Sequence, residues 1–523
     1  MTTARDTLIE SLRDTTKVWD IIVVGGGATG LGVALDAASR GYQTLLLEQA
    51  DFAKGTSSRS TKLVHGGVRY LAQGNIGLVR DALRERGLLL QNAPHLVKNV
   101  SFVIPCYSWW DKILYGVGLA VYDLLAGRLS FGKTRRIPRK KTLEYLPGIE
   151  PKGLHGGVVY HDGQFDDSRL AVNLAQTCLE QGATVLNYFK VTGLKKPGTR
   201  VSGVIAQDLE TGETYQLRGN AIINATGVFV DDLLQMDSPG KRPLVRPSQG
   251  VHVVLDRSFM TGNDALMIPK TDDGRVLFAV PWHDKLVVGT TDTPLNEHSL
   301  EPVALESEID FILNTASRYL SKKPERKDVL SVFAGLRPLA APQGGASKTK
   351  EISRSHKIIL SPSGLITITG GKWTTYRQMA EEAVDAAVSI TSLKSIKSKT
   401  KNLPIHGSMK TSDWEDHLYV YGSDRELLLA LANENPKWGN KLHPKYNYLQ
   451  AEVIWAVRHE MARTVEDVLA RRVRLLFLDA LAAVETAPLT AKLMASELGK
   501  NTEWQNEQVL AFTKLAQSYL LHS

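Results

Sequence analysis

The 523-residue sequence predicts an α/β fold: a parallel, helix-covered sheet, an antiparallel β domain and an all-α C-terminal domain. Three observations support this class. A β-branched apolar strand near the N-terminus runs into a glycine-rich turn and an apolar helix. Short strands separated by turn residues follow one another over residues 245–295. From about residue 405 onward the pattern is helical and has no glycine-rich strand ends.

The N-terminal unit predicts a dinucleotide site. An apolar strand over 20–24 breaks into Gly25-x-Gly27-x-x-Gly30, and a helix, a second strand and Glu48 follow. The three glycines allow, in order, a tight turn, close approach of a pyrophosphate, and packing of helix on strand. The helix N-terminus attracts phosphate, and the acid after the second strand binds a ribose. This unit alone leaves NAD and FAD open.

Composition narrows the class of protein. Hydrophobic content of 43% and a net charge of +8 are typical of a soluble protein with anionic partners. Cys106 and Cys178 form neither a CxxC nor a metal pattern, which predicts buried thiols in a reducing compartment and no metal site. Residues 1–17 contain several acids and predict neither a secretory signal nor a transit peptide. No apolar run reaches the roughly 18 residues that span a bilayer.

A run rich in hydroxyls and glycine, Gly55 to Tyr70, follows the first unit. Such a segment can place N–H groups and hydroxyls against a polar planar ligand, and a mobile surface loop is the alternative. Residues 76–92 then predict a polar helix whose Arg80, Arg84, Glu85 and Arg86 form a solvated face.

An apolar run over 113–126 follows Trp109 and Trp110. A basic segment with no acid comes next: Arg128, Lys133, Arg135, Arg136, Arg139, Lys140 and Lys141. Interfacial tryptophans, a short apolar helix and a polybasic segment together predict contact with an anionic membrane. A core helix followed by a solvated basic loop is the alternative.

Two later strands end in small residues. A strand over 221–224, predicted as separate from a hairpin strand over 213–217, leads into Ala225-Thr226-Gly227, and a strand over 365–369 leads into Gly370-Gly371-Lys372 and a helix. Strand ends that approach the same dinucleotide but lie this far apart in the sequence favour a flavin fold over a compact NAD domain.

The middle and the C-terminal part of the chain add two further interpretations. His252 lies on one of the alternating strands of the predicted antiparallel sheet, where a lone histidine is usually structural. Residues 451–484 have helical periodicity, with charges of both signs placed on polar faces: Glu460, Arg463, Glu466, Arg471, Arg472 and Arg474. Alternating charge favours a salt-bridged packing domain over a nucleic-acid-binding helix.

Taken together, the motifs resemble the FAD-dependent, quinone-linked glycerol-3-phosphate dehydrogenase family. They are the turn at 24–30, the run Gly55 to Tyr70, Ala225-Thr226-Gly227, Gly335-Leu336-Arg337-Pro338, Gly370 to Arg377 and the helical segment from His459 to Asp467. The match covers roughly residues 18–520.

The resemblance implies an FAD-binding Rossmann-like domain with an antiparallel β substrate domain, of glycine-oxidase-like architecture, and an all-α C-terminal domain. The expected FAD-binding domain is discontinuous, with 18–105, 165–245 and 330–395. Residues 106–164 and 246–329 would form the substrate domain, with the membrane-contact segment, and 405–523 the helical domain.

The resemblance also implies oxidation of sn-glycerol 3-phosphate to dihydroxyacetone phosphate by hydride transfer to FAD, with electrons passed to a quinone. Carried over by motif, Arg69, Tyr70, Arg354 and Lys372 would bind the substrate, and His252 and Arg337 would face the reacting carbinol. A phosphate dianion needs such cations, and a neutral imidazole suits proton removal near pH 7. The implied cofactor contacts are Gly25, Gly27, Gly30, Glu48, Thr56, Ser57, Ser58, Lys62, His65, Gly66, Ala225, Gly227, Gly371 and Thr374.

Differences from the family pattern bear on which branch of the family the chain resembles. Trp373 stands where a smaller apolar residue is commoner. The mitochondrial branch's calcium-binding extension and the oxidase branch's internal insertion are not found, which favours a bacterial, quinone-linked enzyme on the cytoplasmic face of the cell membrane. The alternatives are an oxidase that uses oxygen and an amino-acid-oxidising flavoenzyme, although the many site cations favour a dianion. A nucleic-acid-binding flavoprotein ranks last, because only Phe131 interrupts the basic segment. Oligomeric state, including a homodimer, stays open.

Overall fold

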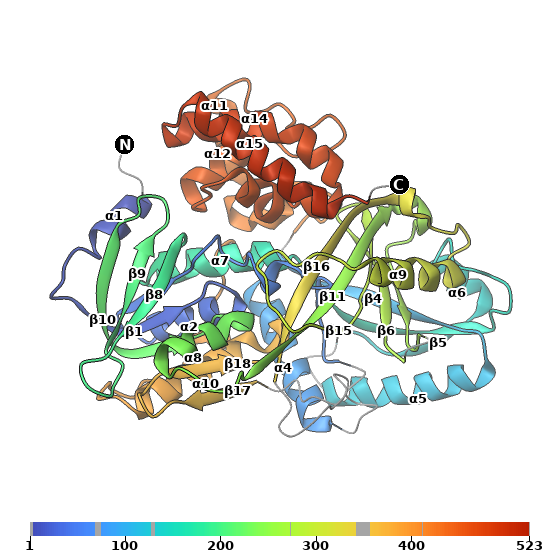
Figure 1. Cartoon of the computed structure of the whole chain (residues 1–523). Helices are drawn as coiled ribbons and strands as arrows, with labels where there is room; N and C mark the ends of the chain where they lie inside the picture. The colour runs from blue at the N-terminus through green and yellow to red at the C-terminus, as the bar shows by residue number, and fades with distance from the viewer. Residues whose placement is uncertain are drawn as a thin grey trace.

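The computed structural model describes residues 4–67, 75–126, 131–271, 274–340, 356–410 and 412–521. Two β-sheets lie next to each other, and a helical domain packs over both of them, at the top of Figure 1. The predicted α/β class, with an antiparallel second sheet and an all-α C-terminal domain, is confirmed.

The first sheet has a parallel centre, and its antiparallel strands all lie toward one side of it. Its parallel strands, in spatial order, are β18 (Ile366–Thr369), β10 (Thr214–Asn224), β1 (Val18–Val24), β2 (Thr44–Leu47) and β7 (Thr184–Leu186). The antiparallel strands are β17 (Lys357–Leu360), β8 (Phe189–Lys195) and β9 (Gly203–Asp208).

Helices cover both faces of this sheet, as a parallel sheet requires. Ile21 and Val23 of β1 share a core with three helices, whereas Ile22 and Val24 point into a second core on the opposite face. The three helices are α2 (Ala28–Ser39), α7 (Asp167–Glu180) and α10 (Tyr376–Ser389). The second core includes α1 (Ala4–Glu10) and α8 (Val230–Asp237).

One strand prediction is corrected here. The segments 213–217 and 221–224, predicted as separate strands, form the single strand β10. Gly219 lies at the predicted break, where a Cβ would come within 2.9 Å of Ile22. Because β1 pairs with β10 on both sides of Gly219, the strand continues through it.

The second sheet is mainly antiparallel. Its strands are β3 (Leu63–Val64), β4 (Val97–Cys106), β5 (Arg135–Pro138), β6 (Gly156–Phe165), β11 (Val245–Asp256), β12 (Ala265–Ile268), β13 (Leu277–Trp282), β14 (Lys285–Gly289), β15 (Thr293–Pro294) and β16 (Val329–Ala340). The helices of this part are α4 (Ile76–Asn92), α5 (Trp109–Ala126), α6 (Arg139–Tyr145) and α9 (Glu306–Tyr319). Strands β3, β4 and β16 belong to this sheet, whereas the predicted boundaries place nearly all of their residues in the FAD-binding domain. The difference arises because the chain crosses between the sheets within these segments.

The C-terminal domain contains α11 (Arg425–Glu434), α12 (Gln450–His459), α13 (Leu475–Leu478), α14 (Ala480–Leu498) and α15 (Thr502–Ala516). The predicted helix over 451–484 is therefore interrupted. Met461 and Arg474 both have positive φ, which ends a right-handed helix. Salt bridges are present as predicted, but Arg471, Arg472 and Arg474 are buried between domains rather than on exposed faces.

The solvated face predicted for α4 is also wrong in part. Glu85 and Arg86 are buried. Arg377 of α10 donates to both carboxylate oxygens of Glu85, and Arg86 pairs with Asp162 of β6 at 2.7 Å. These charges join α4 to α10 and to β6 of the second sheet, so a polar helical sequence alone did not identify its buried side.

Candidate functional site

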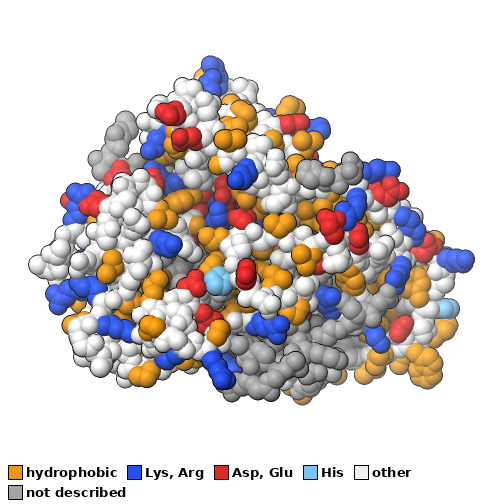
Figure 2. Space-filling model, in the orientation of Figure 1, with side chains coloured by type: hydrophobic (Ala, Val, Ile, Leu, Met, Phe, Trp, Pro, Cys, Tyr) orange, Lys and Arg blue, Asp and Glu red, His pale blue; other side chains and the backbone are white. Residues whose placement is uncertain are grey.

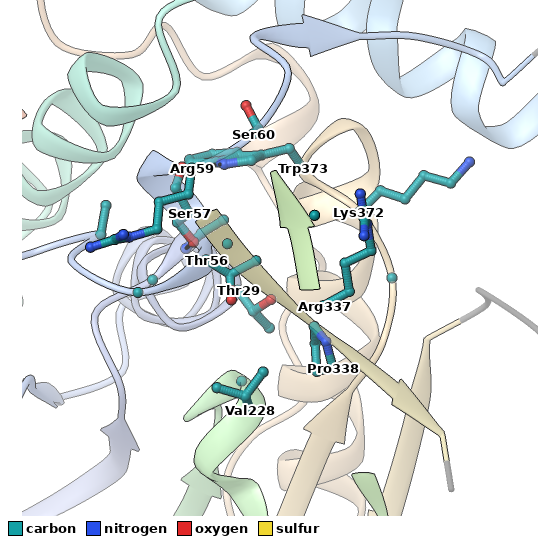
Figure 3. A pocket seen from close by; sticks show the side chains of 18 of the residues that line it. Thr29, Thr56, Ser57, Arg59, Ser60, Val228, Arg337, Pro338, Lys372 and Trp373 are labelled. Atoms are coloured by element: carbon teal, nitrogen blue, oxygen red, sulfur yellow. Dashed lines mark hydrogen bonds between the residues drawn. The ribbon is translucent and has the colours of Figure 1, made fainter. Parts of the chain in front are cut away.

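A cavity of about 730 Å³ lies between the two sheets (Figure 3). It begins at the carboxyl ends of β1, β10 and β18 and extends to residues of β11, β13 and β16. This volume is in the upper part of the range of ligand sites, about 300–1,000 Å³. Arg337 and Lys372 lie on one side of the view in Figure 3, and Ser57 and Arg59 lie on the other.

The predicted phosphate turn lies at one end of this cavity. Gly25 has φ +111°, and a Cβ there would come within 2.6 Å of the Ala225 carbonyl oxygen. Gly30 does not line the cavity, but a Cβ on it would collide with the Gly25 carbonyl. Gly27, the N-cap of α2, has no side chain to cap the helix, and Ala28 N donates to Ser57 Oγ at 2.9 Å. A glycine cradle at a helix start fits a pyrophosphate.

Glu48 lies beside this turn, at the end of β2. Its carboxylate accepts hydrogen bonds from Gly26 N at 2.5 Å and from Ala50 N at 2.9 Å. Burial raises the pKa of Glu48, although these two hydrogen bonds oppose that effect. Each oxygen keeps a further lone pair, so the group can still accept a hydrogen bond from a ribose hydroxyl.

The hydroxyl-rich segment divides into two sets. Thr56, Ser57 and His65 line the cavity, whereas Ser58, Lys62 and Gly66 do not. Lys62 is fully buried, and its ammonium binds Asp167 at 2.8 Å and the Ser58 carbonyl at 2.7 Å. The predicted cofactor contact through the Lys62 ammonium is therefore corrected to an internal ion pair.

Gly66 has a packing role in the structure. A Cβ on Gly66 would come within 2.5 Å of both Leu83 and the Tyr122 hydroxyl, so α4 and α5 require a glycine here. Some residues of the segment thus line the cavity, and others pack in the interior.

The two later strand ends reach the same cavity. Ala225 and Gly227 follow β10, and Gly371, Lys372 and Thr374 follow β18. Gly371 has φ +78°, and a Cβ there would meet the Met379 sulfur at 2.3 Å.

Trp373 links two walls of the cavity. Its indole Nε1 donates to the Ser57 carbonyl at 2.8 Å. Thr374 Oγ1 accepts from His65 N at 3.2 Å. The β18 loop and the hydroxyl-rich segment therefore hold each other in place.

His252 and Arg337 come from neighbouring strands, β11 and β16, and both line the cavity. The His252 ring is buried and stacks on Phe333 with centroids 4.8 Å apart. Burial, and then the positive charges of Lys62 and Arg337, lower its pKa well below the usual value. The imidazole is thus neutral at pH 7 and able to accept a proton.

Arg337 is oriented by two residues that directly follow β14, Thr290 and Asp292. Its Nη2 donates to Thr290 Oγ1 at 3.1 Å, and Nη1 lies 3.5 Å from Asp292 Oδ1. A Cβ on Gly250 would overlap the guanidinium, so this glycine makes the space that the arginine occupies. The planar cation can stabilise negative charge that develops on a substrate oxygen.

Three predicted substrate residues, Arg69, Tyr70 and Arg354, lie outside the described residues. The structure instead adds cavity residues that were not predicted. They are Thr29, Lys54, Arg59, Thr61, Arg275, Thr290 and Asp292. Thr61 lies in the hydroxyl-rich run that was already predicted to face a ligand. Thr290 and Asp292 directly follow β14, so their position next to a strand end was the sequence signal that could have identified them.

The sequence matches the FAD dependent oxidoreductase family over residues 20–377 and the C-terminal domain of alpha-glycerophosphate oxidase over 364–508. The mouse mitochondrial glycerol-3-phosphate dehydrogenase is 39% identical over 98% of this chain and 75% of its own length. A glycerol-3-phosphate dehydrogenase of Bacillus halodurans, solved with FAD, has a TM-score of 0.81 and 29% identity, with all of both chains covered. Glycine oxidase of Bacillus cereus shares the fold alone, with a TM-score of 0.51 and 18% identity over 71% of this chain and 94% of its own. FAD is accordingly the cofactor that the glycine turn, Glu48 and the two later strand ends fit. The chain belongs to the family of FAD-dependent glycerol-3-phosphate dehydrogenases.

Proposed function

We propose that this chain oxidises sn-glycerol 3-phosphate to dihydroxyacetone phosphate and passes the electrons to a membrane quinone. The observation that carries the proposal is the pair formed by His252 and Arg337 on one wall of the FAD cavity. A neutral buried base beside a fixed cation is what oxidation of a carbinol requires. The names of the relatives supply the substrate.

Each residue then has a task in the reaction. Lys372, with Arg69, Tyr70 and Arg354, binds the phosphate dianion and brings C2 to the wall that carries His252. His252 takes the proton of the C2 hydroxyl, and Arg337 stabilises the negative charge that develops on that oxygen. Bound FAD supplies the acceptor for the hydride that leaves C2. The mostly apolar lining of the cavity strengthens these charge interactions.

The second part of the proposal places the enzyme on an anionic membrane surface, at the cytoplasmic face of the cell membrane. Helix α5 exposes seven large apolar side chains, and hydrophobic side chains are visible at the lower right of Figure 2, where this helix lies in Figure 1. The seven exposed side chains are Trp109, Trp110, Ile113, Leu114, Val117, Val121 and Leu124. Six exposed basic residues follow within 133–141. Apolar insertion and charge attraction in adjoining segments support binding to anionic lipid. Within the described part of the chain, every helix is too short or too polar to cross a bilayer.

A quinone dissolved in that membrane is the acceptor that this placement supports. The acceptor test compares two products after reaction with glycerol 3-phosphate in air. Reduction of a soluble quinone analogue with little peroxide supports the proposal. Stoichiometric peroxide without quinone reduction would favour an oxidase instead.

A further inference from the structure

The segment that joins β15 to α9 runs along the FAD cavity. Its two ends are bound to β11, because Leu295 N donates to a carbonyl of that strand and a side-chain amide of the strand donates to the Val303 carbonyl, each at 2.9 Å. Between these ends, residues 296–299 are exposed, whereas Leu300 lines the cavity. We call residues 296–302 the strap. The strap therefore has one face toward solvent and one side chain at the cofactor site.

His298 binds the strap to the residues that follow β10. Its Nε2 lies 3.3 Å from a carboxylate oxygen of Asp232, and its ring meets the Phe229 ring edge to face, with centroids 4.8 Å apart. Phe229 and Asp232 both line the cavity. The side chains of His298 and Asp232 are 33% and 53% exposed, so water can replace this contact at little cost.

Glu301 binds the strap to the opposite side of the cavity, on the hydroxyl-rich segment. Arg59 Nη2 donates to its carboxylate at 2.5 Å, and Lys54 Nζ lies 3.6 Å from the other oxygen. Lys54 and Arg59 both line the cavity. The Tyr519 hydroxyl, near the C-terminus, also donates to Glu301 at 3.4 Å. A charge-assisted contact to the buried Arg59 is the stronger of the two attachments.

The two attachments lie on opposite sides of the phosphate turn, residues 25–28. That turn lies beside Ala225 on the side of His298, and it donates to Ser57 on the side of Glu301. Because His298 and Glu301 are three residues apart, the strap between them spans at most about 11 Å. A segment this short that touches both sides, with Leu300 in the cavity wall, crosses the cavity where the pyrophosphate binds.

We propose that the strap is the outer wall of the FAD site over the pyrophosphate, and that FAD enters and leaves when the strap lifts from its attachments. Leu300 packs against the cofactor. His298 and Glu301 are positioning residues, since they hold the wall through other side chains. Opening begins at His298, whose contact is the more exposed of the two. This inference concerns the cofactor alone and goes beyond the proposed function.

The test compares FAD release from the wild-type holoenzyme, His298→Ala and Leu300→Ala. Dilution of each holoenzyme, followed by flavin fluorescence, gives the release rate and the dissociation constant, and their ratio gives the binding rate. The contacts of His298 join protein groups to each other, so they oppose opening whether FAD is entering or leaving. In His298→Ala we therefore expect release and binding both to be about three- to tenfold faster, with a dissociation constant within about twofold of the wild type.

Leu300→Ala should give a different pattern. Its side chain contacts the bound cofactor, so truncation should accelerate release and raise the dissociation constant together, by about fivefold, with little change in the binding rate. The matched control is Glu297→Ala, which changes an exposed residue next to His298 on the same strap and should leave both rates unchanged.

Three results would overturn the proposal. One is an unchanged release rate in His298→Ala, and another is an equal acceleration in Glu297→Ala. The third is a wild-type release rate and dissociation constant in Leu300→Ala, which would show that the strap does not touch FAD.

Hydrogen exchange of the holoenzymes tests the opening itself. Amides of residues 296–302 should exchange faster in His298→Ala than in the wild type, whereas those of α9 should exchange equally fast in both. Equal exchange of the strap in the two proteins would contradict the proposal. Failure of glycerol 3-phosphate to reduce the flavin would refute the proposed function and leave these FAD measurements unaffected.

Discussion

Arg472 and Asp51 form a two-pronged ion pair between the C-terminal domain and the FAD-binding sheet. Arg472 Nη1 lies 2.8 Å from Asp51 Oδ2, and Nη2 lies 3.0 Å from Oδ1. Arg471 binds the same buried carboxylate at 2.5 Å. Burial alone would raise the pKa of Asp51, but the Arg472 and Arg471 guanidiniums lower it well below its usual value. Asp51 directly precedes the segment that lines the cofactor cavity, so this contact joins the domain to the site.

Asp51→Asn should destabilise the protein strongly. The substitution leaves two buried guanidiniums without their shared counter-charge, and breaking such a pair costs about 3–5 kcal/mol. Denaturant unfolding of the holoenzyme measures the loss. The matched control is Asp310→Asn, which removes an exposed partner of Arg326 and should change stability by less than about 1 kcal/mol. Equal losses in the two variants would contradict the role given to the buried pair.

Gly25→Ala should weaken FAD binding by about 10- to 100-fold. An alanine at this positive φ is strained by about 1–3 kcal/mol, and its Cβ would lie too close to the Ala225 carbonyl. Both effects disturb the turn that receives the pyrophosphate. Fluorescence titration of the apoprotein with FAD gives the affinity. Gly41→Ala is the control, since Gly41 also has positive φ but a Cβ there meets nothing within 4 Å. Wild-type affinity in Gly25→Ala would argue against the turn as the pyrophosphate site.

Removing apolar side chains from α5 should reduce binding to vesicles. The double variant Trp110→Ser/Leu124→Ser removes two side chains that are each 79% exposed, with little effect on the core. We expect at least about a tenfold lower partition onto vesicles of anionic lipid, because each apolar group contributes more than 1 kcal/mol when it inserts. Leu510→Ser, at a site 72% exposed in the C-terminal domain, is the control. Equal loss in the control would mean that α5 is not the contact surface.

Stability should fall as the pH rises from about 6.5 to about 9, partly because of His406. Burial would lower the pKa of this histidine, but hydrogen bonds to Asp424 at 2.6 Å and Glu180 at 2.5 Å raise it to about 9. A raised pKa means that the folded state holds the proton more tightly, so the stabilisation is full below the unfolded pKa and lost through about pH 9. In His406→Asn the unfolding midpoint should depend less on pH between pH 7 and 9. If the midpoint changes with pH as much as in the wild type, His406 is not the source of this pH dependence.

Much of the fold could be predicted because local patterns and tertiary packing agree. The strand, glycine turn and helix at 20–40 form one supersecondary unit, and the apolar run Ile21–Val24 is buried on both faces of the sheet, as predicted for a central parallel strand. Predictions were wrong where distant residues decide the outcome. Arg471 and Arg472 look like surface charges until Asp51, about 420 residues earlier, is known to lie beside them.

The candidate site was likewise predictable only in part. The cavity glycines were predictable, because a positive φ or a close approach of another backbone requires glycine, which is visible in the sequence. Thr61 was not predicted as a site residue, because only the packing of the 55–62 segment on β11 places its hydroxyl at His252. The Lys62 ammonium was misplaced for the reverse reason, since its partner Asp167 lies on another element.

The most direct test of the account is anaerobic bleaching of the yellow, FAD-loaded enzyme. Glycerol 3-phosphate should reduce the flavin, whereas glycerol and amino acids should not, because the site cations require a phosphate dianion. In His252→Gln the reduction should slow by about 10²- to 10⁴-fold, the range that a general base contributes. The account is contradicted if glycerol 3-phosphate leaves the flavin oxidised, or if His252→Gln is reduced as fast as the wild type.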